Sequence, residues 1–115
     1  MEVTLKPDIN IIGESENLNS IIRDRFVESN LFNKVFIDTM NNEMENTDIS
    51  ICSSLSKYNK LLEYYGVKVL FTGANNTTLK KYDIDDNTLI LSKGIYTLKD
   101  LANIVFDHYS KIKGK

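Results

Sequence analysis

Apolar residues occur along the chain in short runs that are separated by stretches with a different period. Each run is too short for an isolated helix and is bounded by glycine, asparagine, serine or charged residues, which is typical of buried strands. The runs that predict strands are Asp8–Gly13, Lys34–Thr39, Asp48–Ser53, Val67–Thr72 and Thr88–Ser92.

Helical spacing appears after the first run and again after the third. A helix is predicted from Ser15 or Asn17 to Asn30, with Leu18, Ile21, Ile22 and Phe26 on its core face. A second helix is predicted to begin at Ser54 or Ser56 and to end at Gly66, a usual place for a left-handed residue. Its expected buried stripe is Leu55, Tyr58, Leu62 and Tyr65.

The last third of the chain predicts a short helix over Thr78–Tyr82 and a long final helix. The final helix begins with Thr97-Leu98-Lys99-Asp100, a capping box in which the threonine accepts from the helix start and the aspartate reaches back. Its expected core face is Leu98, Leu101, Ala102, Val105, Tyr109 and Ile112.

The alternation of strands and helices predicts an α/β fold with a mostly parallel sheet and helices on both faces. We expect the flavodoxin-like, doubly wound arrangement with five strands in the order 2-1-3-4-5. The segment Met40–Thr47 is short for a parallel crossover. We therefore expect a missing or minimal second helix there, and an antiparallel second strand at the sheet edge is the alternative.

Length and composition narrow the class of protein. A chain of 115 residues, 42% hydrophobic and 26% charged, predicts one globular domain over residues 1–115. A net charge of −2 does not suggest nucleic acid, and a single cysteine and a single histidine leave no expected metal site. We expect no membrane span and a cytoplasmic location, and the wealth of Asn, Ile and Lys suggests a bacterial source.

Polar side chains follow the predicted strands where the chain leaves the sheet. Glu14 follows the first strand, Ser53 ends the third, Thr72 ends the fourth and Lys93 follows the fifth. Because functional residues of a doubly wound sheet gather at the carboxyl ends of its strands, these four are the candidate site.

These segments resemble the receiver (response-regulator) family over nearly the whole chain. "INIIGESENLNSII" is similar to the family's first strand with its acidic pair, here Gly13-Glu14. "TDISICSS" is similar to the segment with the phospho-accepting aspartate, and "VKVLFTGA" to the fourth strand with its small hydroxyl residue, here Thr72. "LILSKGIYTLKDLANIV" is similar to the fifth strand, the lysine and the last helix, with Lys93-Gly94 in place of Lys-Pro.

The sequence departs from the family where the family's chemistry resides. The resemblance implies Mg²⁺ held by carboxylates and phosphorylation of an aspartate, but Ser53 occupies that aspartate's position and Glu14 alone remains of the acidic pair. A serine hydroxyl without an adjacent base is a poor nucleophile. Ile90 also replaces the aromatic switch residue, and Lys93, without a phosphoryl partner, is expected to pair with Glu14.

The resemblance therefore implies a degenerate pseudo-receiver, similar to the atypical receiver domains at the N-termini of pilus-assembly and partition-type ATPases. We expect no enzyme activity, cofactor or metal, and a function in bacterial regulation or assembly through a protein partner or a homodimer. Receivers commonly pair through the fourth and fifth strand–helix units, and this resemblance makes Tyr96, Lys99, Asp100 and Asn103 the expected interaction face.

Two alternatives remain open at this point. Ser53, Ser54, Thr72 and Lys93 could surround an anion, which would suggest a small phosphate- or nucleotide-handling protein. Cys52 could be a nucleophile, although its place in an apolar strand favours a buried structural thiol.

Overall fold

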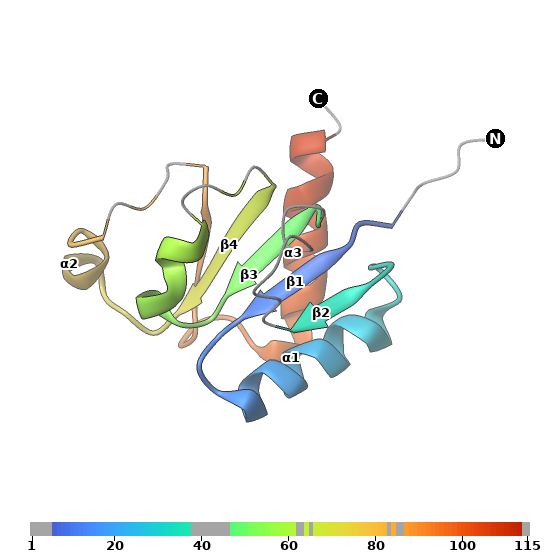
Figure 1. Cartoon of the computed structure of the whole chain (residues 1–115), viewed down its shortest axis with the longest axis horizontal. Coiled ribbons are helices and arrows are strands. Elements are labelled where there is room, and N and C mark those ends of the chain that lie inside the picture. Colours follow the sequence, from blue (N-terminus) through green and yellow to red (C-terminus); the bar gives the residue numbers. More distant parts are fainter. Residues whose placement is uncertain are drawn as a thin grey trace.

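The computed structural model describes residues 6–37, 47–61, 64, 66–82, 84 and 87–113 (Figure 1). A five-stranded sheet has the order β2-β1-β3-β4-β5, and each neighbouring pair is parallel. The strands are β1 (Ile9–Ile12), β2 (Val35–Ile37), β3 (Ile49–Cys52), β4 (Val67–Thr72) and β5 (Leu89–Ser92). The predicted flavodoxin-like α/β fold is confirmed, and the antiparallel alternative for the second strand is wrong. The expected minimal second helix falls on residues 38–46, which lie outside the described residues.

Helix α1 (Glu16–Ser29) begins and ends at side chains that the sequence marks. The Ser15 hydroxyl accepts from the amide of Leu18 at 3.2 Å, and Asn30 ends the helix with a left-handed φ of 59°. One prediction for its core face is wrong, because Ile21 is exposed while Asn19 is buried with Ile22 and Phe26. The side-chain Nδ2 of Asn19 donates to Gly13 O at 3.1 Å, which gives this buried polar side chain a partner at the end of β1.

The segment predicted as a second α-helix is the 3₁₀ helix η2 (Leu55–Leu61). Leu55, Tyr58, Leu61 and Tyr64 all pack in one apolar cluster. This spacing of three residues places them on one side of a 3₁₀ helix, which has three residues per turn. The buried stripe that was predicted with α-helical spacing therefore has the wrong period. Two of its members, Leu62 and Tyr65, lie outside the described residues.

Gly66 does not have the left-handed conformation expected of it. A Cβ on Gly66 would instead overlap the Tyr64 ring, so a glycine is needed there for close approach.

The remaining helices are α2 (Asn76–Leu79) and α3 (Leu98–Lys113). Helix α2 begins earlier than predicted because the Asn75 side chain accepts from the amide of Thr78 at 2.9 Å. In α3 the amide of Asp100 donates to the Thr97 hydroxyl at 3.3 Å, as expected, but that hydroxyl donates in turn to the Asp100 carboxylate at 2.9 Å. Ile112, predicted for the core, is exposed, since it lies beyond Tyr109, the last α3 side chain packed on the apolar core.

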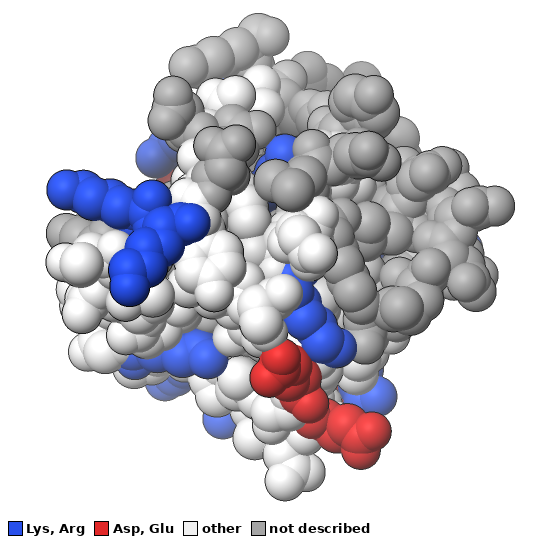
Figure 2. Space-filling view, turned by 60° about the vertical axis from the view of Figure 1, so that its left-hand side comes forward, with Lys and Arg blue, Asp and Glu red and all other residues white. Residues whose placement is uncertain are grey.

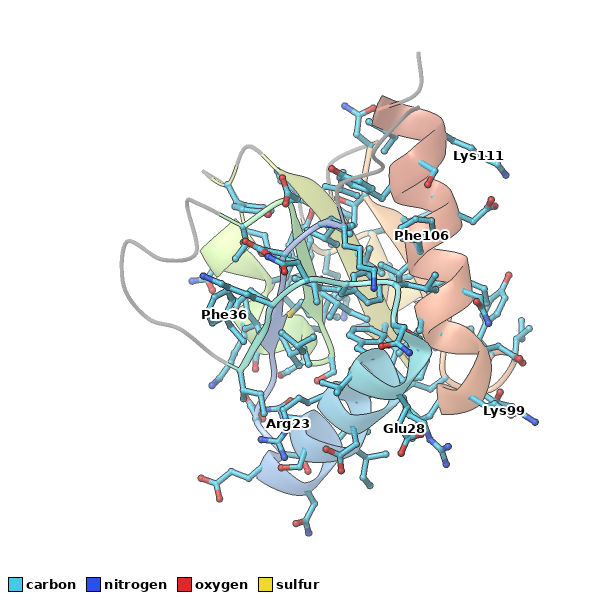
Figure 3. All side chains as sticks on the ribbon, turned by 90° about the vertical axis from the view of Figure 1, so that its right-hand side faces the viewer. Arg23, Glu28, Phe36, Lys99, Phe106 and Lys111 are labelled. Atoms are coloured by element: carbon cyan, nitrogen blue, oxygen red, sulfur yellow. The ribbon has the colours of Figure 1, made fainter. Side chains whose placement is uncertain are left out.

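The two faces of the sheet carry separate apolar clusters. The larger cluster joins alternate strand residues to α1 and α3, and the smaller joins the other strand residues to η2. In Figure 1, η2 lies in front of the sheet and α3 behind it. Figure 3 shows Phe36 of β2 and Phe106 of α3 on opposite sides of the sheet, as the alternation of strand side chains requires.

Candidate functional site

The carboxyl ends of β1 and β3 meet in a tight polar contact around Gly13. Ser53 and Asn19 are both buried, and a Cβ on Gly13 would overlap Ser53 Oγ and stand 2.5 Å from Asn19 Oδ1. The Ser53 hydroxyl donates to Ile12 O at 3.4 Å, and its amide donates to the same oxygen at 2.8 Å. Ser53 therefore joins the two strand ends, and its hydroxyl is turned to the backbone.

Lys93 reaches across the end of β4 to the end of β3. Its Nζ donates to Ser53 O at 3.0 Å and lies 5.7 Å from the centre of the Phe71 ring. An ammonium over an aromatic ring is attracted by the partial negative charge on the face of the ring. The expected partner Glu14 is not used, because within the described part of the chain no ion pair joins Lys93 to Glu14.

Glu14 contacts the start of η2. Its carboxylate accepts a hydrogen bond from the Ser56 hydroxyl, and the hydroxyls of Ser56 and Ser54 are 2.9 Å apart. These side chains are on the surface, so the carboxylate is solvated and its charge is screened. Glu14 and Ser53 thus lie near each other in the fold, but each has a different partner.

Thr72 is the fourth member of the predicted group and ends β4. Its side chain is buried, and its hydroxyl accepts from the amide of Ala74 at 3.1 Å. This bond closes the turn that leaves the strand. Glu14, Ser53, Thr72 and Lys93, which we call the strand-end group, therefore lie at the ends of neighbouring strands, as predicted.

The chemistry open to the strand-end group follows from these partners. A nucleophile needs a base within hydrogen-bond reach, and the Ser53 hydroxyl instead has a backbone carbonyl. The Lys93 ammonium has three donors, one of which is used by Ser53 O, and the residue is exposed. Among the described residues, no three His, Cys, Asp or Glu side chains gather where they could hold a metal ion.

Cys52 and His108 show how burial constrains the other reactive side chains. The Cys52 thiol is fully buried and donates to Ser54 O at 2.9 Å, so the expectation of a buried structural thiol is confirmed. His108 is half-buried on α3, and burial lowers the pKa of its imidazole, with a smaller contribution from Lys111.

The expected interaction face is divided between core and surface. Tyr96 is half-buried and packs on the larger cluster, whereas Lys99, Asp100 and Asn103 are exposed on the first turns of α3. Sequence reasoning missed Ile95, whose side chain is 75% exposed directly before Tyr96. An isoleucine within the polar turn Lys93–Thr97 was the available signal.

Tyr64, three residues beyond the end of η2, is 6% exposed. Its hydroxyl donates to Thr47 O at 2.7 Å and lies 3.2 Å from Thr47 Oγ1. Burial raises the pKa of this phenol, and the hydrogen bond with Thr47 opposes that shift. Tyr64 thus closes the amino end of β3 under η2 and is not available to a partner.

Comparisons with known proteins do not extend this picture: no family model, no curated protein and no solved structure matches the chain. None of the helices in the described ranges is long and apolar enough to cross a membrane.

Proposed function

We propose that this chain is a non-catalytic pseudo-receiver domain that acts by protein–protein contact, as a docking or dimerisation module in bacterial regulation or assembly. The observation that carries the proposal is the apolar surface around β5. Ile90 in this strand is 43% exposed, and Ile95 after it is 75% exposed. The two exposed isoleucines lie five residues apart, in the edge strand and in the turn that follows it, and exposed apolar surface of this kind supports an interaction site.

The position of β5 supports the same proposal. It is the last strand in the sheet order, and among the described residues it pairs only with β4. The amide of Lys93 donates to Thr72 O at 2.9 Å. Because backbone N–H and C=O groups alternate in direction along a strand, those of Leu89 and Leu91 also face β4, whereas those of Ile90 point to the outer edge of the sheet. Unlike edges that are blunted by lysine or proline, Leu89–Ser92 carries neither.

Charge favours a protein partner over nucleic acid. Among the described residues on the face in Figure 2, basic side chains are spread among neutral ones with a group of acidic side chains, and they form no continuous basic stripe. Near β5, Lys99 and Asp100 place opposite charges side by side, which suits the rim of a protein interface.

Sedimentation velocity over a wide concentration range tests homodimerisation. We expect a concentration-dependent dimer. Ile95→Lys should raise its dissociation constant at least about tenfold, because an isoleucine that is buried in the dimer interface would be replaced by a charged side chain. The matched control is Val27→Lys on α1, which changes a side chain that is 57% exposed elsewhere. A monomer at every concentration, or equal effects of both variants, would contradict homodimerisation through β5.

A second candidate is a phosphate- or nucleotide-handling protein, which the exposed, positively charged Lys93 at the strand ends favours. Amide NMR with beryllofluoride or acetyl phosphate and Mg²⁺ separates the two. Large shifts at Ser53 and Thr72 that disappear in Lys93→Ala would support the anion site. Unmoved amides at both residues would support the pseudo-receiver, because Ser53 offers no carboxylate to phosphorylate.

A further inference from the structure

The 3₁₀ helix η2 makes side-chain hydrogen bonds to two separate parts of the molecule. At its amino end, Ser56 donates to the Glu14 carboxylate in the strand-end group. Two residues later, Tyr58 OH lies 2.8 Å from Thr88 Oγ1, and both groups are buried. Thr88 directly precedes Leu89, the first residue of β5. One short helix therefore contacts both the strand-end group and the start of the edge strand.

Packing holds η2 against the sheet. Tyr58 and Leu61 are buried in the smaller cluster against Ile12, Cys52 and Leu70. Ser56 is exposed and outside this cluster, so a displacement of Ser56 would reach the Tyr58 ring through the short backbone segment between them. The short sequence separation leaves little chain to absorb the movement.

The 3₁₀ geometry makes such a displacement possible. The amide of Lys57 donates to Ser54 O at 3.0 Å in the i to i+3 pattern. This pattern has poorer hydrogen-bond geometry than an α-helix, and 3₁₀ segments often mark hinges. The sheet face that η2 covers also includes the buried polar residues Ser50 and Asn10, beside the apolar residues that pack with Tyr58 and Leu61.

We propose that η2 is a mechanical link between the strand-end group and the edge strand β5. A ligand or protein that engages Glu14 takes the carboxylate away from Ser56, η2 shifts, and the Tyr58–Thr88 hydrogen bond moves the start of β5. The coupling is reciprocal, so binding at β5 changes the Ser56–Glu14 contact by the same free energy. The link depends on the proposed function only for its biological role, because the contacts that form it lie within a single chain.

Backbone amide NMR of the full chain tests the link from both ends. Ser56→Ala removes one contact, and we expect shifts at Leu89 and Ile90, which are not neighbours of Ser56 in sequence. Those shifts should be lost when the same change is made in a Tyr58→Phe background. In the reverse direction, Thr88→Val should shift the amides of Glu14 and Ser15.

Matched controls and hydrogen exchange sharpen the test. Ser110→Ala and Tyr82→Phe remove exposed hydroxyls outside this path and should leave the β5 amides unmoved. Exchange of the Lys57 amide should become roughly fivefold faster in Tyr58→Phe, which corresponds to about 1 kcal/mol for one lost hydrogen bond. Thr88→Val breaks the same bond from the other side if Tyr58→Phe does not fold.

The link is overturned if Ser56→Ala leaves Leu89 and Ile90 unmoved, or if their shifts persist in the Tyr58→Phe background. Both results are obtained on the monomer at low concentration. If the link fails but the dimer forms, the proposal of the link is wrong. If the link holds but the chain stays a monomer at every concentration, homodimerisation is wrong.

Discussion

The two faces of the sheet are formed by the same strands but differ in the polarity of their side chains. On the face under α1 and α3, every strand position is apolar, with Ile9, Ile49 and Val69 as examples. On the face under η2, Asn10, Ser50 and Lys68 lie beside one another in register across three strands. The first face, which we call the apolar face, is held by burial, whereas the second, the mixed face, also depends on hydrogen bonds to its cover.

This difference explains which cover each face has. An apolar face is stabilised by long amphipathic helices, which bury a wide stripe without needing polar partners. The mixed face is covered by η2 and by Tyr64 beyond it. The rings of Tyr58 and Tyr64 pack in the smaller cluster, while their hydroxyls bond to Thr88 and Thr47. A tyrosine suits that role because it combines a large apolar ring with a polar end.

The largest expected effect is on the apolar face. Phe26 is fully buried on α1 with its ring centre 5.0 Å from that of Phe32. Phe26→Ala should lower the free energy of unfolding by about 3–5 kcal/mol, because it removes a ring and leaves a cavity. Urea denaturation followed by circular dichroism measures this, with Phe26→Leu as a control expected to cost much less. A cost below about 1 kcal/mol would mean that this face is not the main source of stability.

Where the two faces meet at the strand ends, Gly13 should be sensitive to substitution. Gly13→Ala places a Cβ against Ser53 and Asn19 and should cost about 1–3 kcal/mol, since a buried overlap forces side chains or backbone to move. Gly73→Ala is the matched control, because a Cβ there has nothing within 4 Å and φ is not positive. The same urea measurement should find it neutral or slightly stabilising. Equal costs for the two glycines would contradict the close approach.

The contrast between the faces also explains what the sequence could predict. Strand positions, sheet order and the capped helices α1 and α3 follow from local patterns: β4 was predicted at both ends, and Ser15, Asn30 and Thr97 marked helix limits. These features depend on residues near each other in sequence. The apolar face was therefore largely predictable.

The mixed face was predicted less well because its determinants are distant in sequence. The 3₁₀ period of η2 is fixed by what Tyr58 and Tyr64 contact, namely Thr88 and Thr47. Likewise, the strand-end group was found from the topology, but the partner of Lys93 was not. A lysine beside both a carbonyl and a carboxylate can bond to either, and only the folded backbone shows that Ser53 O lies within its reach.

A more moderate effect is expected from Tyr64 on the mixed face. Tyr64→Phe leaves the buried Thr47 contacts without their partner and should cost about 1–3 kcal/mol. It should also change the alkaline response. Because the pKa of Tyr64 is raised above 10.0 in the folded chain, the unfolded phenol ionises first, so stability falls as the pH rises past that value.

Urea midpoints at neutral and alkaline pH test both parts of this prediction. Tyr64→Phe should lose part of the alkaline decline, and Tyr109, whose pKa is also raised by burial, should supply the remainder. Tyr82→Phe is the control, because that side chain is exposed. An unchanged alkaline response in Tyr64→Phe would contradict the buried phenol.

The smallest expected effect is at His108, on the helix that covers the apolar face. Its pKa is lowered from 6.5 mainly by burial, so as the pH falls through 6.5 the unfolded chain takes up a proton that the folded chain takes up only at lower pH. Stability therefore declines with falling pH in that window and levels off once the folded imidazole is also charged. His108→Gln should remove this part of the acid response in urea midpoints measured above and below pH 6.5.

Two neighbours on α3 provide a direct check of the cause. Lys111 lowers the His108 pKa and Asp107 raises it, and the two side chains form an ion pair at 3.1 Å. Lys111→Gln removes the repelling charge and frees the Asp107 carboxylate, so both changes raise the imidazole pKa and weaken the acid response. Asp107→Asn should strengthen it for the opposite reason. If both variants leave the response unchanged while His108→Gln removes it, burial alone sets the pKa, and the surface charges of α3 have no part in it.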